Sequence, residues 1–213
     1  MTIRVLLADD HAIIRDGLRA LLQSIADIEV VDAVGDGRRA VRHAIELRPD
    51  VVIMDIAMPD LNGIEAVRIL RDKLPSTRVV MLSMHSDSEH VYRALNAGAD
   101  GYLLKESAAD EVVSAVRAVR AGQRYLSRAL ESLERRSEVR TNRVSPLDSL
   151  SARERQVLQL VVEGRSSTEI ARMIHLSPKS VDTYRSRLMK KLGVADVTAL
   201  VKFAIQHGLT SAS

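Results

Sequence analysis

The chain has 213 residues, 46% of them hydrophobic and 28% charged, which is enough apolar material for the core of one large domain or two ordinary ones. It contains no cysteine, which excludes disulfides, thiolate zinc sites and thiol catalysis and favours a reducing compartment. The net charge of +3 is uneven, because residues 1–126 carry 16 basic and 19 acidic side chains whereas residues 151–213 carry 10 and 5. The basic C-terminal third favours a module that binds a polyanion.

Apolar segments with the composition of strands alternate with amphipathic segments through the first 122 residues. The predicted strands are residues 3–8, 29–34, 51–55, 78–82 and 101–104. After each of them, apolar residues recur at intervals of three and four, which is typical of helices packed on a sheet. This alternation predicts an α/β domain, a flavodoxin-like (βα)5 fold with a doubly wound parallel sheet.

Polar residues stand where the predicted strands end. They are Asp9, Asp10, Asp55, Ser83 and Lys105. Because the carboxyl ends of parallel strands share one edge of a sheet, we expect these side chains to converge. Clustered carboxylates suit Mg²⁺, while a lysine and a hydroxyl supply the charge and the positioning that phosphoryl transfer needs. The pattern therefore predicts a phosphoryl site in which Asp55 is the acceptor.

Four motifs in residues 1–122 resemble the receiver domain of two-component response regulators. They are Leu7-Ala8-Asp9-Asp10-His11, Met54-Asp55-Ile56-Ala57-Met58-Pro59, Met81-Leu82-Ser83 and Gly101-Tyr102-Leu103-Leu104-Lys105. The resemblance implies that Asp55 takes a phosphoryl group from a partner sensor histidine kinase. It also implies that Mg²⁺ binds Asp10, Asp55 and the backbone carbonyl of Ala57, with Asp9 acting nearby.

The resemblance assigns roles to three further residues. Lys105 would contact the phosphoryl oxygens, the Ser83 hydroxyl would move to bond the phosphoryl group, and the Tyr102 ring would then rotate inward. His11 lies beside the pocket at a helix start, and we expect it either to have a structural role or to support the pocket residues, rather than to be catalytic. Glu106 departs from the family pattern, since many receivers have a proline there that follows a cis peptide bond.

A second set of helical apolar patterns begins at residue 150, after a segment in which the pattern is weak. We expect residues 123–149 to be a partly helical linker and residues 150–213 to be a small all-α domain of four helices. Residues 168–174, a short turn and residues 178–192 have the form of a helix-turn-helix, in which the last segment is the recognition helix. The face of this helix predicted to contact DNA carries Lys179, Asp182, Thr183, Ser186, Arg187 and Lys190.

From pattern alone, an ordinary amphipathic helix with a solvated charged face is an alternative for residues 178–192. Further motifs resemble the LuxR-type output domain. They are Leu150-Ser151-Ala152-Arg153-Glu154, Glu169-Ile170-Ala171, Leu176-Ser177-Pro178-Lys179-Ser180-Val181 and Lys191-Leu192-Gly193-Val194. A receiver joined to this domain is the NarL/FixJ class, and residues 177–185 and 206–209 are similar to its GacA/UvrY branch. Tyr184 and Asp182 depart from the pattern, since many members have histidine and a basic residue there.

The combined resemblance implies a phosphorylation-gated transcriptional regulator that binds promoter DNA as a homodimer and is not an enzyme. A Mg²⁺-dependent phosphohydrolase would also use an aspartyl phosphate, but Ile56 and Ala57 supply neither a general acid nor a substrate-binding cap. A DNA-binding protein with a vestigial Asp55 is disfavoured by the intact switch and lysine positions. The sequence shows no signal peptide and no long uncharged apolar run, so we expect a cytoplasmic protein without membrane contact.

Overall fold

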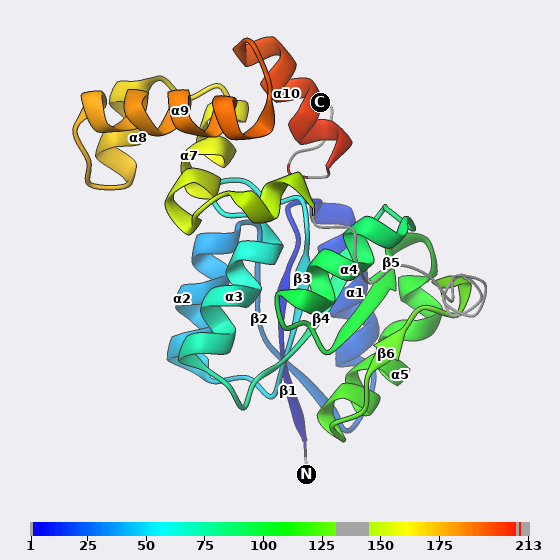
Figure 1. The fold of residues 1–213 in the computed structure, drawn as a ribbon. Helices are drawn as coiled ribbons and strands as arrows, with labels where there is room; N and C mark the ends of the chain where they lie inside the picture. Colours follow the sequence, from blue (N-terminus) through cyan, green and yellow to red (C-terminus); the bar gives the residue numbers. More distant parts are fainter. Residues whose placement is uncertain (1, 131–144, 208, 210–213) are drawn as a thin grey trace. The chain divides into compact units, whose positions relative to one another are not determined.

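The chain forms two compact units, residues 1–141 and 142–213 (Figure 1). The structure, a computed structural model, describes residues 2–130, 145–207 and 209. The middle of the segment predicted to be a linker, residues 131–144, therefore lies outside the described residues. None of the helices in the described ranges is long and apolar enough to cross a membrane.

The first unit is a parallel sheet with helices on both faces (Figure 1). Its strands are β1 (Ile3–Ala8), β2 (Ile28–Val34), β3 (Val51–Asp55), β4 (Arg78–Ser83), β5 (Gly101–Leu104) and β6 (Tyr125–Leu126), in the spatial order β2-β1-β3-β4-β5-β6. Its helices are α1 (Ala12–Gln23), α2 (Gly37–Leu47), α3 (Gly63–Lys73), α4 (Ser88–Asn96) and α5 (Ala108–Arg120). Every neighbouring pair of strands is parallel, so the predicted fold class is confirmed.

The central strand β3 is buried on both faces. Val52 and Met54 point into the apolar layer beneath α2, α3 and α4, whereas Val51 and Ile53 point into the layer beneath α1 and α5. This explains why the strand is an uninterrupted apolar run without alternation. Each such side chain, when fully buried, stabilises the fold by about 1.5–3 kcal/mol. The strand is consequently a rigid support for the carboxylate at its end.

The strand register brings the strand ends to one edge of the sheet. Ala8 pairs with Met54, and Asp55 pairs with Leu82. Further along, Ser83 pairs with Leu104, the residue before Lys105. The polar residues that end β1, β3, β4 and β5 are therefore neighbours in space, although they are far apart in the sequence.

The sixth strand is a difference from the predicted five-stranded sheet. Tyr125 pairs with Gly101, so β6 extends the sheet beyond β5 within the segment expected to be a linker. The buried Glu111 carboxylate on α5 holds this segment, since it accepts hydrogen bonds from Tyr125 Oη at 3.1 Å and Ser127 Oγ at 3.0 Å. Ser127 N–H also donates to the Tyr102 carbonyl at 2.9 Å. A strand of two residues is too short to show a periodic pattern.

The second unit is all-helical, as predicted. A short 3₁₀ turn, η2 (Pro146–Ser149), precedes α7 (Ala152–Val162), α8 (Ser167–Met173), α9 (Pro178–Leu192) and α10 (Val197–Gln206). Ser151 and Ser166 begin α7 and α8 with capping boxes completed by Glu154 and Glu169. Helix α9 has the bounds expected for the recognition helix, because Ser177 caps it, Pro178 occupies its first turn and Gly193 ends it in the left-handed region.

Gly63 gives a test of how tightly α3 packs on the end of β3. A Cβ at this position would lie 2.0 Å from the carbonyl oxygen of Asp55, which belongs to rigid backbone. Gly63→Ala should therefore lower the free energy of unfolding by about 1–3 kcal/mol, measured by urea denaturation. Gly17→Ala on α1 is the matched control, since a Cβ there meets nothing within 4 Å. It should stabilise the protein by up to about 1 kcal/mol, and equal effects of the two changes would contradict the packing argument.

Candidate functional site

Two buried carboxylates and one lysine meet at the carboxyl edge of the sheet. Lys105 Nζ lies 2.7 Å from Asp55 Oδ2 and 2.9 Å from Asp9 Oδ2. The three side chains are each 3–4% exposed, whereas Asp10 lies at the rim with 29% exposure. Burial this deep opposes ionisation of the carboxyls, and Lys105 supplies a counter-charge that favours the ionised form.

Local hydrogen bonds fix the direction of the two buried carboxylates. Asp9 Oδ1 accepts from the His11 N–H at 2.8 Å, directly after β1 ends. Asp55 Oδ1 accepts from the Ala57 N–H at 3.3 Å, where the chain turns after β3. Lys105 begins a 3₁₀ turn, η1 (Lys105–Ser107), immediately after β5. No cis peptide bond occurs in the described ranges, so the chain passes Glu106 in the trans form.

The electrostatics of the site favour an additional cation. Burial raises the pKa of the Asp55 carboxyl to about 7, and the charges of Asp9 and Asp10 act in the same direction against the opposing effect of Lys105. Burial by itself would lower the pKa of the Lys105 ammonium, but Asp55 and Asp9 outweigh it, and the pKa is raised. Three carboxylates thus share one lysine, which leaves the pocket with excess negative charge.

The donor set fits Mg²⁺. One oxygen each of Asp9, Asp10 and Asp55 lies within 4.8 Å of the others, together with a nitrogen of His11. Asp9 Oδ2 and Asp10 Oδ1 are buried, and in the part of the chain that the structure describes their close contacts are the ion pairs with Lys105 and His11, without a well-directed hydrogen bond. Carboxylate oxygens with unused acceptor capacity suit a hard cation that also keeps several waters.

The half-exposed His11 ring contacts the carboxylates of this pocket. Its Nδ1 is 2.8 Å from Asp10 Oδ1, 3.3 Å from Asp9 Oδ1 and 3.9 Å from Asp55 Oδ2. The residue is the N-cap of α1 and has extended backbone, so its ring turns back over the carboxylates. The sequence placed it correctly at a helix start but gave no signal for the direction of its side chain.

The two predicted switch residues are linked through a third residue. Ser83 and Tyr102 are buried, with 1% and 0% exposure. Tyr102 Oη donates to the His85 carbonyl at 2.8 Å, and the His85 N–H donates to Ser83 Oγ at 3.0 Å. The Tyr102 ring is therefore already inside the protein in this conformation, whereas the family resemblance predicted that it rotates inward after phosphorylation.

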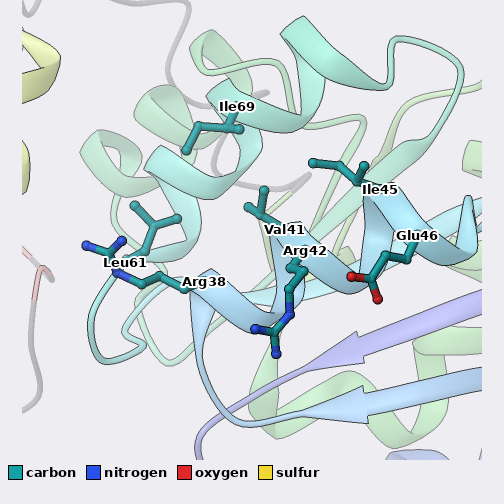
Figure 2. Close-up of a pocket in the computed structure, with 7 residues that line it drawn as sticks. All are labelled: Arg38, Val41, Arg42, Ile45, Glu46, Leu61 and Ile69. Atoms are coloured by element: carbon teal, nitrogen blue, oxygen red, sulfur yellow. The ribbon is translucent and has the colours of Figure 1, made fainter. Parts of the chain in front are cut away.

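A shallow groove of about 340 Å³ lies elsewhere on the first unit, between α2 and α3 (Figure 2). Its lining residues are Arg38, Val41, Arg42, Ile45, Glu46, Leu61 and Ile69. None of the predicted site residues contributes to it. The phosphoryl site predicted from the strand ends is thus distinct from this groove.

The predicted DNA-contact face of α9 is exposed. Its six residues are Lys179, Asp182, Thr183, Ser186, Arg187 and Lys190, and each of them is exposed. Val181 and Leu188 on the opposite side are fully buried in the core of the second unit. The apolar stripe and the polar face therefore have the orientation that the sequence predicted.

Asp182 has a partner within the protein. Its Oδ1 accepts from Ser167 Oγ on α8 at 2.6 Å, and Ser167 Oγ in turn accepts from Arg185 Nη1 at 2.9 Å. These bonds tie α8 to α9. The sequence identified Asp182 as a departure from the family pattern but did not indicate Ser167 or Arg185, because a contact between two helices leaves no local pattern.

Comparison with known proteins gives matches to both units. The family of the response regulator receiver domain matches residues 5–117, and the luxR family of bacterial regulatory proteins matches residues 148–204. The chain is 39% identical to the transcriptional regulatory protein MctR of Rhizobium johnstonii, over 98% of this chain and 96% of MctR. It is 38% identical to the response regulator UvrY of Escherichia coli K12, over 99% of this chain and 97% of UvrY.

Solved structures give a match over both units as well. The complex of the two-component response regulator RcsB with DNA has a TM-score of 0.60 at 27% identity, and the match covers 95% of this chain and 98% of RcsB. A second structure contains two RcsB dimers bound to two parallel DNAs, with a TM-score of 0.60 and the same identity and coverage.

The raised pKa of Asp55 predicts a particular dependence of stability on pH. The folded protein binds this proton more tightly than the unfolded chain, for which the pKa is 3.8. The contribution of Asp55 to stability is therefore present below pH 4 and is lost as the pH rises through about 7. In the presence of a chelator, wild type should lose stability relative to Asp55→Asn between pH 4 and pH 8, by on the order of 4 kcal/mol.

Chemical denaturation at a series of pH values measures this difference. Asp16→Asn is the control, because Asp16 is exposed on α1. The stability of Asp16→Asn should run parallel to that of wild type. If the curve of Asp55→Asn also ran parallel to wild type, the carboxylate cluster would not be the source of the effect.

Proposed function

The chain belongs to the response regulators that join a receiver domain to a LuxR-type DNA-binding domain, and we propose that Asp55 is the phosphoacceptor that controls it. Members of this family are DNA-binding transcriptional regulators and not enzymes, which removes the phosphohydrolase alternative. The observation that carries the proposal is the buried Asp55 carboxylate, paired with Lys105 beside two further carboxylates.

We propose that the phosphoryl group comes from the phosphohistidine of a sensor histidine kinase. An Asp55 oxygen attacks phosphorus, the phosphorus–oxygen bond forms and the phosphorus–nitrogen bond to the donor histidine breaks. Lys105, now 2.7 Å from the carboxylate, is placed to neutralise the phosphoryl oxygens. Asp10, Asp55 and the backbone carbonyl of Ala57 would hold Mg²⁺, with Asp9 nearby, and the ion would supply further charge neutralisation.

Exposed apolar side chains next to the pocket support docking of a protein donor. Ile13 on α1 is 90% exposed, two residues beyond His11. Met84 is 71% exposed and directly follows Ser83. Exposed apolar side chains at these two positions would offer contacts to a protein partner. The kinase domain would therefore cover the entrance to the pocket while the phosphoryl group is transferred.

The output that we propose is binding of promoter DNA by a homodimer in the cytoplasm. Lys179, Arg187 and Lys190 give α9 the cationic groups that hold phosphates, and Thr183 and Ser186 are small enough to allow close approach to base edges. The dimers that RcsB forms on DNA support the same assembly here. Asp182 would orient α9 through Ser167 rather than read a base directly, because its carboxylate is already hydrogen-bonded.

Acyl-phosphate labelling tests the acceptor. Wild type incubated with a phosphodonor and Mg²⁺ should gain one phosphoryl group that is labile to hydroxylamine. Asp55→Asn should abolish this labelling, because the amide is a poor nucleophile and cannot form the acyl phosphate. Asp16→Asn should be labelled like wild type. Full labelling of Asp55→Asn would show that another residue is the acceptor.

Salt-dependent DNA binding tests the recognition helix. Lys179→Ala and Arg187→Ala should each weaken binding and lower the slope of log affinity against log salt by about 0.9, since each removes one phosphate contact. Lys202→Ala provides the control, because this lysine is exposed on α10 and not on α9. Unchanged slopes in both α9 variants would mean that another element contacts the DNA.

A further inference from the structure

The backbone of His85 is the point at which the two switch residues meet. Its N–H donates to Ser83 Oγ and its carbonyl accepts from Tyr102 Oη, at 3.0 and 2.8 Å. A shift of the His85 backbone would therefore disturb the Ser83 hydroxyl and release the Tyr102 ring together. Contacts that hold the His85 backbone in place therefore also hold Ser83 and Tyr102 in their present conformations.

The side chain of His85 is held in place by residues at the start of α4. Its ring stacks on the ring of His90, with centroids 4.4 Å apart and planes inclined by 12°. His90 is 3% exposed, and its Nδ1 lies 2.7 and 2.8 Å from the two oxygens of Asp87. Asp87 is itself the N-cap of α4, since its Oδ1 accepts from the His90 N–H at 3.1 Å. We call Asp87, His90 and the His85 ring the histidine clamp.

A metal site is a poor explanation of the histidine clamp. The lone pairs of an imidazole lie in the ring plane, so two nearly parallel stacked rings do not direct their nitrogens at a shared ion. Asp87 already holds His90 Nδ1, as a carboxylate does when it orients an imidazole. His90 Nε2 is buried without a hydrogen-bond partner in the described ranges, which is costly. Leucine at this position would avoid that cost, but it would offer no ring for His85 to stack on.

We propose that His90 and Asp87 are positioning residues of the switch: the histidine clamp holds the His85 backbone so that Tyr102 is bound inward before the phosphoryl group arrives. This inference rests on the proposed function, in which Ser83 and Tyr102 report phosphorylation of Asp55. None of the clamp residues belongs to the predicted metal or phosphoryl site. Loosening the clamp should therefore release Tyr102 and weaken the response to phosphorylation, while phosphoryl acceptance by Asp55 persists.

Fluorine NMR of the full chain containing fluorotyrosine tests the proposal without phosphorylation. The Tyr102 resonance is assigned with Tyr102→Phe. Wild type should show one buried Tyr102 signal, whereas His90→Ala should show loss of that signal or a second, solvent-exposed one. His90→Phe keeps a ring for stacking and should restore the wild-type spectrum. Asp87→Ser keeps an N-cap for α4 but releases His90, and should change the Tyr102 signal without opening a core cavity.

Two further measurements separate this proposal from the proposed function. Acetyl phosphate should label Asp55 in His90→Ala to the same final stoichiometry as in wild type. Sedimentation should show that the dimerisation gained on labelling falls at least fivefold in His90→Ala and recovers in His90→Phe. A wild-type Tyr102 signal in both His90→Ala and Asp87→Ser would overturn the role of the clamp. Absence of labelling in wild type would instead contradict the assignment of Asp55 and leave the NMR result to be judged independently.

Discussion

The pairing of Lys105 with the buried carboxylates of Asp9 and Asp55 is the interaction on which the receiver unit depends. Two carboxylates with less than 5% exposure would repel each other and lose hydration if no cation lay between them. The sheet order is β1-β3-β4-β5 in this region, so Lys105 reaches Asp55 past the end of β4 and Asp9 past the ends of both β4 and β3. Neighbouring strands are about 4.8 Å apart, and only a long flexible side chain spans that gap. Strand β4 carries Ser83, which brings the hydroxyl into the same neighbourhood.

The sequence predicted those parts of the fold that a regular apolar pattern encodes. Strand β3 is buried on both faces and leaves an uninterrupted apolar run, whereas helix α9 buries one stripe and leaves a helical periodicity. The bounds of α9 were predictable for a further reason, since Ser177, Pro178 and Gly193 are strong helix start and stop signals. Strand β6 was not predictable in this way. It depends on hydrogen bonds to Glu111, which is 14 residues away from Tyr125.

In the candidate site, too, some features were predictable from the sequence and others were not. The residue types at the strand ends indicated which backbone positions converge, because parallel strands share an edge. The directions of individual side chains were not predictable, and the contacts that the His11 ring makes with the carboxylate cluster are one example. Asp182 gives a second example. It is exposed on the predicted DNA-contact face, but its hydrogen bond to Ser167 depends on the crossing of α8 and α9, which neither helix encodes alone.

The short strand β6 has a consequence for how the protein behaves at high concentration. Without it, β5 would be the last strand of the sheet and would present unpaired N–H and C=O groups to other molecules. Exposed edge strands recruit further strands and promote aggregation, and proteins reduce this hazard by ending a sheet with a very short strand. Two residues pair with Gly101 and Tyr102 and then leave the sheet, so little edge remains for another chain to extend. The segment that leads out of the receiver thereby protects this edge of the sheet, opposite β2, against unwanted association.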